Sequence, residues 1–362
     1  MRIKTITCHD VYNIGASLQA YALAAYLQEL GHDVQIIDYK PTYLRHYRLC
    51  GVNNPAYDKP VLREVYNVLK FPGRLKARGE KRKKSFDLFT QTYLPVTAQT
   101  FLNNETLKQA PPEADVYFAG SDQIWNTLFQ NGKDPAFYLD FAPSKAVCAS
   151  YAASFSTDSI AEEWKMQIKR WISRLDYISV RESTGVKLLR EMGFSDVEQV
   201  MDPVFLLSRE HWCNMADAPV SQQPYVLVYD FEQDEKIGTL ARKMADENGW
   251  RVYSVLKNPW CDKSFEQEGP TAFLSLVRDA QFVLSNSFHA TAFSLIFEKP
   301  FCVFERSENI NTRMQDLLRA VNLNAYNKDI EYEDVNVWLD KKIRSSKAYI
   351  AKVLRAAERE FK

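Results

Sequence analysis

The chain has 362 residues, which is enough for two domains of ordinary size. Its 46 basic and 46 acidic residues give a formal net charge of zero, which argues against a nucleic-acid-binding protein and against an acidic disordered tail. None of the six cysteines forms a C-x-x-C pair, the N-terminus lacks a signal-peptide pattern, and no apolar run approaches the roughly 18 residues of a membrane span. We therefore expect a cytoplasmic protein with reduced cysteines.

The first forty residues predict a strand, a loop, a helix and a second strand. Side chains alternate over 3–8 as in a strand, and apolar residues recur at helical spacing over 18–30. Ser17 is the predicted cap of this helix and Gly31 its predicted stop, before a second strand over 34–39. A βαβ opening of this kind predicts a parallel, layered α/β sheet.

The alternation of strands and helices continues along the chain. The N-terminal part predicts strands over 116–119, 146–152 and 177–180 and helices over 161–175 and 183–192. After a crossover at 201–206, the C-terminal part predicts strands over 225–229, 251–256, 282–284 and 301–304 and helices over 235–248, 271–278, 290–297 and 334–361.

This order predicts an α/β protein of two doubly wound, Rossmann-like domains that face each other across a cleft. We expect the first domain to span residues 1–203 and the second to span residues 204–333. The C-terminal helix, 334–362, is expected to join the first domain.

Several familiar motifs are absent from the sequence. No G-x-G-x-x-G follows the first strand, which argues against a dinucleotide cofactor, and there is no Walker A loop, H-E-x-x-H or G-x-S-x-G. No D-x-D pair is present to hold a metal against a nucleotide diphosphate, and the five histidines are scattered. We therefore expect neither a metal nor a cofactor.

Four polar segments each follow a predicted strand, at the edge where open α/β sheets bind their ligands. In the first, Asn13 and Gly15 open a helix, where backbone N–H groups can approach an anion; a tight turn with a helix cap is the alternative. The second follows the strand that ends at Ala119, and a cap explains only part of it. Its candidate ligand-binding residues are Ser121, Asp122, Gln123 and Trp125.

The third and fourth segments supply positive charge. Arg181 ends a strand, where its guanidinium can bind a carboxylate or phosphate through two hydrogen bonds; a structural ion pair is the alternative. In the fourth segment, Asn286, Ser287 and His289 lie between an apolar strand and a helix. Donors at a helix start favour a negatively charged ligand there.

These segments together resemble the polysaccharide pyruvyl transferase family. The matching motifs follow one another from residue 13 to about 318 and are Asn13-x-Gly15, Leu18–Leu23, Gly120-Ser121-Asp122-Gln123-x-Trp125-Asn126, Tyr151–Phe155, Ser179–Glu182, Asp202-Pro203 and Asn286–Thr291. The resemblance implies a two-Rossmann fold similar to that of many glycosyltransferases, called GT-B. It also implies transfer of a pyruvyl group from phosphoenolpyruvate onto two hydroxyls of a sugar, giving a cyclic ketal in exopolysaccharide, capsule or cell-wall polysaccharide biosynthesis.

The resemblance also suggests roles for individual residues. Arg181 and His289 match positions tied to donor binding and catalysis, and Asp122 is the candidate base or partner of a sugar hydroxyl. Arg313 is the candidate for a second cationic contact with the donor. Some members of the family have an arginine two residues before the histidine, whereas this chain has Ser287 there.

Two other functions stay open on the sequence alone. One is a metal-independent GT-B glycosyltransferase that uses a nucleotide sugar, and the other is a catalytically silent carbohydrate-binding or scaffold protein. If the protein is the pyruvyl transferase, one alternative for its acceptor is a sugar carried on a polyprenyl diphosphate. The basic run over 74–84 is expected to be a solvated helix face or a loop. As a sharper hypothesis, it contacts either the anionic inner face of the membrane or the diphosphate of a polyprenyl-linked acceptor.

Overall fold

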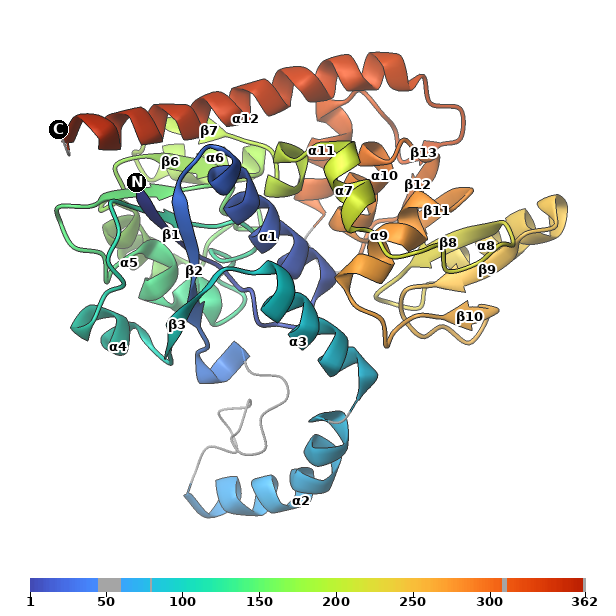
Figure 1. Cartoon of the computed structure of the whole chain (residues 1–362), viewed down its shortest axis with the longest axis horizontal. Helices are drawn as coiled ribbons and strands as arrows, with labels where there is room; N and C mark the ends of the chain where they lie inside the picture. The colour runs from blue at the N-terminus through green and yellow to red at the C-terminus, as the bar shows by residue number, and fades with distance from the viewer. Residues whose placement is uncertain (45–59, 79, 308–310, 361–362) are drawn as a thin grey trace.

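The computed structural model describes residues 1–44, 60–78, 80–307 and 311–360, without the side chains of 60–63 and 74–78. Two mainly parallel β-sheets, each flanked by helices, form the two halves of the described chain (Figure 1). The fold is therefore α/β, with two Rossmann-like domains, as the alternation of elements predicts. The domain boundary between residues 203 and 204 stays a prediction.

The first sheet has the strand order β3-β2-β1-β4-β5, and all its pairs are parallel. Its strands are β1 (Arg2–Ile6), β2 (Asp33–Tyr39), β3 (Val96–Phe101), β4 (Val116–Ala119) and β5 (Val147–Ser150). A short parallel pair, β6 (Ile178–Val180) and β7 (Val197–Gln199), continues from β5 through isolated bridges. The strand order reverses between β1 and β4, and this switch point is where such sheets bind ligands.

The second sheet repeats the same topology. Its order is β10-β9-β8-β11-β12-β13, with β13 antiparallel to β12 and the other pairs parallel. The strands are β8 (Tyr225–Tyr229), β9 (Arg251–Ser254), β10 (Lys263–Ser264), β11 (Phe282–Ser285), β12 (Phe301–Val303) and β13 (Tyr326–Asn327). Here the switch point lies between β8 and β11.

Helices cover both sheets. They are α1 (Ile14–Glu29), α2 (Pro60–Arg78), α3 (Lys81–Tyr93), α4 (Asn104–Gln109), α5 (Glu162–Ile172), α6 (Ser183–Glu191), α7 (Arg209–Met215), α8 (Glu235–Asn248), α9 (Pro270–Arg278), α10 (Phe288–Ile296), α11 (Thr312–Ala320) and α12 (Tyr332–Glu360). The 3-10 turns are η1 (Thr42–Leu44), η3 (Asn131–Lys133), η4 (Pro135–Tyr138) and η5 (Pro203–Leu206). In the described part of the chain, no helix is long and apolar enough to span a membrane.

Most predicted elements are confirmed within a few residues, and the main error lies at the start of α1. The helix begins at Ile14, because Asn13 Oδ1 accepts a hydrogen bond from Ala16 N (3.1 Å) and caps it. Ser17 is therefore wrong as the cap, since it lies inside the helix. Gly31 adopts φ 84° just after the helix, in the left-handed region that glycine tolerates best.

Two helices connect the domains. Helix α1 is buried along nearly its whole length and contacts β2, η5 and α9, so it lies between the two sheets. Helix α12 runs across the top of the view in Figure 1 and contacts β5, η5 and α11. The described residues of the C-terminal helix thus touch the first sheet, as predicted, and also the second domain; residues 361–362 lie outside the described part.

The basic run predicted at 74–84 makes a contact between the domains. Lys81 pairs with Glu268, and Arg82 Nη1 donates to the backbone oxygen of Glu266 (2.8 Å). Lys83 pairs with Asp87 in its own helix. The side chains of 74–78 and the whole of residue 79 lie outside the described residues. The start of α3 is therefore engaged within the protein rather than free as a cationic surface.

Candidate active site

A cavity opens between the two domains. Its walls come from the segments that follow β1 and β4 in the first sheet and β8 and β11 in the second. The lining residues are Asn13, Gly15, Asp122, Gln123, Tyr229, Phe231, Asn286, Ser287, Phe288, His289, Arg306, Asn311, Arg313 and Met314. Both topological switch points therefore face the same space, as the ligand-binding edge of each sheet predicts.

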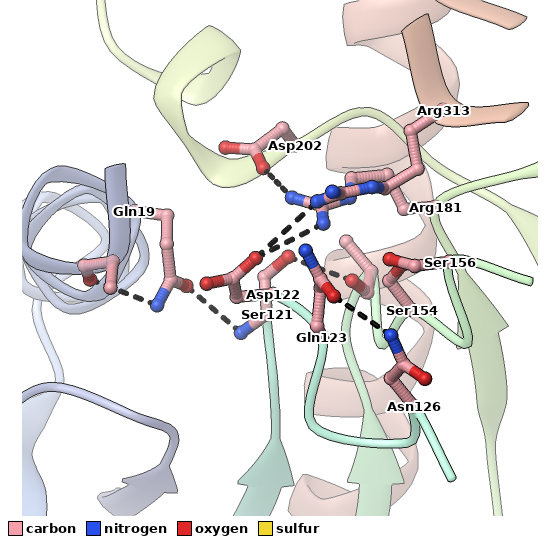
Figure 2. A network of polar contacts seen from close by, with 12 residues as sticks. Gln19, Ser121, Asp122, Gln123, Asn126, Ser154, Ser156, Arg181, Asp202 and Arg313 are labelled. Carbon is pink, nitrogen blue, oxygen red and sulfur yellow. Dashed lines mark hydrogen bonds and ion pairs between the residues drawn. The ribbon is translucent and has the colours of Figure 1, made fainter. Parts of the chain in front are cut away.

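Arg181 lies at the centre of a buried charge cluster (Figure 2). Its Nη1 pairs with Asp202 Oδ2, and its Nη2 donates to Asp122 Oδ1 at 3.2 Å. Arg313 Nη1 lies 3.5 Å from the same Asp122 oxygen. Two guanidinium groups thus share two carboxylates, and the four charges cancel.

Burial and charge act in opposite directions on the carboxylates of this cluster. Burial alone would raise the pKa of Asp122, but Arg181, Arg313 and His289 hold it below its usual range. Burial likewise opposes ionisation of Asp202, and His289 and Arg181 hold the pKa of that carboxyl low. Burial and the nearby charge of Arg181 lower the pKa of Arg313 to about 10. All four side chains are therefore charged at neutral pH.

His289 faces the cavity from the first turn of α10. Ser287 caps this helix, and His289 Nε2 lies 3.6 Å from Asp202 Oδ2, too far for a hydrogen bond. Among the described residues, no group accepts from or donates to this nitrogen, although it is buried. Gly15 packs on the other side of the ring, because a Cβ added at Gly15 would stand 2.0 Å from His289 Nδ1. The glycine of the first domain thus makes room for the histidine of the second.

Three helix N-termini point toward the cavity. Asn13 caps α1, Ser287 caps α10 and Asn311 precedes α11. The first N–H groups of a helix have no partner within it, and the helix dipole adds partial positive charge there. The cavity is therefore suited to an anion, even though the nearby arginines and aspartates balance each other.

Aromatic side chains complete the walls. The ring of Phe288 lies beneath both arginines of the cluster, with its centroid 4.8 Å from Arg181 Cζ and 5.7 Å from Arg313 Cζ. At the other end of the cavity, the ring of Phe231 lies 4.8 Å from that of Tyr229 and 5.0 Å from Arg306 Cζ. Both parts of the cavity wall thus combine a guanidinium group with an aromatic ring.

Most of the site residues predicted from the sequence come together here. Those that line the cavity are Asn13, Gly15, Asp122, Gln123, Asn286, Ser287, His289 and Arg313. Arg181 lies directly behind Asp122 and lines a smaller, adjoining cavity. The side chain of Asn286 is occupied on both ends, since it donates to Asp230 and accepts from Phe231 N, so it positions the loop after β8.

Two of the predicted residues lie elsewhere. Trp125 is fully buried, stacks on Tyr138 at 5.4 Å between ring centroids, and donates from Nε1 to the backbone oxygen of Phe137. Ser121 is also fully buried; its Oγ donates to the backbone oxygen of Ala152, and its N–H donates to Gln19 Oε1 (Figure 2). Both predictions are corrected: these side chains build the loop that presents Asp122.

Three functional candidates were missed among the predicted site residues. Asp202 was recognised only as part of a motif, yet it joins Arg181 to the His289 region. Phe231 follows β8 and Arg306 follows β12, so the rule that sites gather at strand ends could have found both. No cluster of three or more histidine, cysteine or acidic side chains suited to a metal occurs in the part of the chain that the structure describes.

The arrangement of the two domains is that of GT-B enzymes. MnaA from S. aureus, solved with UDP, is similar over 96% of this chain and 88% of its own, with 14% identity and a TM-score of 0.51. A Listeria monocytogenes protein assigned as a UDP-N-acetylglucosamine 2-epimerase is similar over 96% of this chain and 89% of its own, with 10% identity and a TM-score of 0.50. At these identities the likeness concerns the fold alone.

The sequence itself defines the family more closely. Residues 13–308 match the profile of the polysaccharide pyruvyl transferase family, and the chain belongs to this family. No curated protein gives a significant match. The family makes the protein a transferase that acts on a sugar or polysaccharide.

Proposed function

We propose that this protein transfers the pyruvyl group of phosphoenolpyruvate to two hydroxyls of a sugar and so forms a cyclic ketal. The reaction would belong to the synthesis of an exopolysaccharide, capsule or cell-wall polysaccharide. The observation that carries the proposal is the meeting of His289, two arginines and three helix N-termini around one cavity in a member of this family.

The donor's two anionic groups suit this cavity. Phosphoenolpyruvate carries a carboxylate and a phosphate, which helix N-termini and guanidinium groups bind well. Because Asp122 and Asp202 already balance Arg181 and Arg313, the helix N-termini supply the remaining positive potential. Arg306 also lines the cavity, but Glu232 Oε1 lies 3.8 Å from its Nε and offsets its charge.

In the proposed reaction, His289 gives a proton to the methylene carbon of the donor. The electron pair of the C=C bond forms the new C–H bond, and C2 becomes electron-poor. The oxygen of one sugar hydroxyl bonds to C2, the C2–O bond to phosphate breaks with its electron pair, and the second hydroxyl closes the ring. One hydroxyl proton replaces the proton that His289 gave, and the other leaves with the phosphate, so the reaction balances.

Asp122 and Asp202 take different parts in this proposal. The lowered pKa of Asp122 keeps it a carboxylate at neutral pH, so it suits hydrogen bonds from sugar hydroxyls better than proton storage. Asp202 is a positioning residue, since it holds Arg181 and stands behind the His289 ring.

Donor binding can be tested without knowing the acceptor. Calorimetry with phosphoenolpyruvate alone should give saturable binding that Arg181→Lys weakens. Incubation with the donor and a set of sugars should then release phosphate only when an acceptor is present, together with a pyruvyl-sized mass gain on the sugar. Activity only with nucleotide sugars would overturn the proposal in favour of a glycosyltransferase, and binding of neither donor would favour a silent carbohydrate-binding protein.

A further inference from the structure

Helix α2 exposes an unusual set of large apolar side chains. Val65, Val68, Leu69 and Phe71 have 52%, 72%, 74% and 42% of their surface exposed, all within one seven-residue stretch. Figure 1 shows α2 projecting below the body of the molecule, away from both sheets. Scattered exposed apolar residues are ordinary, whereas a contiguous patch of this kind marks a surface that another body covers.

The exposed apolar side chains of α2 neighbour one another on the helix surface. Val68 follows Val65 by three positions and Leu69 follows it by four, a spacing that places helical side chains side by side. Lys70 falls on the side of the helix opposite Val65 and Val68. Over its whole length the sequence of the helix has five basic residues and one acid. A helix that combines exposed apolar neighbours with an excess of basic residues is typical of segments that lie in the surface of a membrane.

The basic residues at the start of α3 are already bound within the protein. Lys81 and Arg82 are bound to the segment around Glu266 and Glu268 in the second domain, and Lys83 is bound to Asp87. A membrane contact therefore belongs to α2 rather than to the start of α3.

Helix α3 also links α2 to the active site. It begins three residues after α2 ends, and Arg82 Nη2 donates to the backbone oxygen of Tyr12 (2.8 Å), directly before Asn13. The Tyr12 hydroxyl in turn donates to Asp87 of α3 (2.8 Å). A lipid surface that held α2 would thus be connected, through α3, to the loop of Tyr12 and Asn13 at the cavity.

We propose that α2 docks the protein on an anionic lipid surface, with the face that contains Val65 and Val68 in the boundary between headgroups and acyl chains. The basic positions attract the lipid phosphates, and this attraction weakens as salt rises. The excess of basic over acidic positions favours anionic lipid over a second copy of the same helix, whose charge would repel it. This inference does not depend on the chemistry of the active site.

Vesicle co-sedimentation of the full chain tests the docking. Phosphatidylcholine vesicles that contain phosphatidylglycerol should bind the protein at low salt, and vesicles of phosphatidylcholine alone should bind it less. The double substitution Val68→Glu and Leu69→Glu should lower the partition coefficient by about tenfold or more, because it places charges on the apolar face. Met166→Glu is the matched control: Met166 is 82% exposed on α5, so its substitution should leave binding unchanged.

Thermal melting and light scattering complete the test. Both substituted side chains are exposed, so the double variant should melt like the unchanged protein, and a loss of binding then reports on the surface rather than on folding. No binding of the unchanged protein to the anionic vesicles, or equal binding of the double variant, would overturn the proposal. A dimer that the same two substitutions convert to a monomer would instead assign the patch to contact between two copies.

Discussion

Two histidine–aspartate pairs stand beyond the ends of strands, and they are built differently. His9 follows β1, and its Nε2 lies 3.0 Å from Asp38 Oδ1, while its Nδ1 lies 3.4 Å from the backbone oxygen of Thr7. Asp38 also accepts from Thr100 Oγ1 and pairs with Lys40 at 3.0 Å. Every partner belongs to the first sheet or its flanks, so this pair is complete without a ligand.

The pair of His289 and Asp202 joins the second domain to the segment after β7 and is left incomplete. Its 3.6 Å separation exceeds a hydrogen bond, and the buried Nε atoms of Arg181 and Arg313 also have no partner among the described residues. Leaving a buried polar group without a hydrogen bond costs about 1–3 kcal/mol. The contrast teaches that unsatisfied polar atoms, more than the presence of a histidine and an acid, distinguish a ligand site from a structural pair.

The largest expected effect comes from exchanging the two histidines for glutamine in separate variants. His289→Gln should lower turnover by about 10²-fold or more, as for a general acid, because glutamine cannot carry the proton. His9→Gln should leave turnover near that of the unchanged protein and lower the melting temperature instead. Steady-state kinetics and thermal melting on both variants check the comparison, and near-normal turnover of folded His289→Gln would remove its catalytic role.

Arg181 should show a smaller, donor-specific effect. Arg181→Lys should weaken phosphoenolpyruvate binding by about tenfold or more, since an ammonium cannot hold Asp122 and Asp202 together, and a carboxylate left unbalanced beside the cavity repels the anionic donor. Arg242→Lys is the control, because Arg242 pairs with Asp262 at a distance of 2.9 Å on an exposed surface. Calorimetry measures both. An unchanged donor affinity together with a weaker acceptor affinity would place Arg181 on the acceptor side instead.

Gly15→Ala tests the close contact with His289. The added Cβ has no room beside the imidazole, so we expect turnover to fall by roughly tenfold as the ring or the helix shifts. Gly73→Ala in α2 is the matched control, because nothing lies within 4 Å of its added Cβ. There alanine should preserve activity and stabilise the helix by about 0.5–1 kcal/mol. Equal activity of the two variants would show that the contact at Gly15 is not needed.

The smallest effect concerns acid stability. The pKa values of Asp38 and Asp202 are both held low against the effect of burial, by hydrogen bonds from His9 and Thr100 in one case and by His289 and Arg181 in the other. A lowered pKa contributes stability above the unfolded value of about 4, and this stability is lost as the pH falls below it. Melting temperatures between about pH 6 and pH 2 should therefore fall less steeply in Asp38→Asn and in Asp202→Asn. Only Asp202→Asn should also change catalysis at neutral pH; loss of activity in Asp38→Asn without unfolding would contradict the comparison.

The fold could be predicted largely because buried parallel strands are short apolar runs between helices. The runs at 225–229 and 282–284 are of this kind, and the structure has β8 and β11 there. The stretch 40–110 gave no such signal, since β3 has a mixed sequence and α3 is strongly charged at its start. The positions of α3 and β3 depend on contacts with the second domain and with β2, and the local sequence carries no information about such contacts.

The site was predicted best where position along a strand decides the outcome. Asp122 and His289 follow β4 and β11, and topology alone brings such ends to one cavity. Trp125 was misjudged because a polar motif can place an indole either in the core or against a ligand. Asp202 was missed because its importance lies in distances to Arg181 and His289, which only the folded chain sets.

The contact between Gly15 and His289 means that the cavity is complete only when the two domains are in contact. Each residue belongs to a different domain, so molecules whose domains stand apart hold only half of the wall. The measured affinity for any ligand that touches both halves is then the intrinsic affinity multiplied by the fraction of closed molecules. The pair of Lys81 and Glu268 bridges the domains without lining the cavity. Residues remote from the ligand can therefore tune how tightly it is held while leaving every direct contact in place.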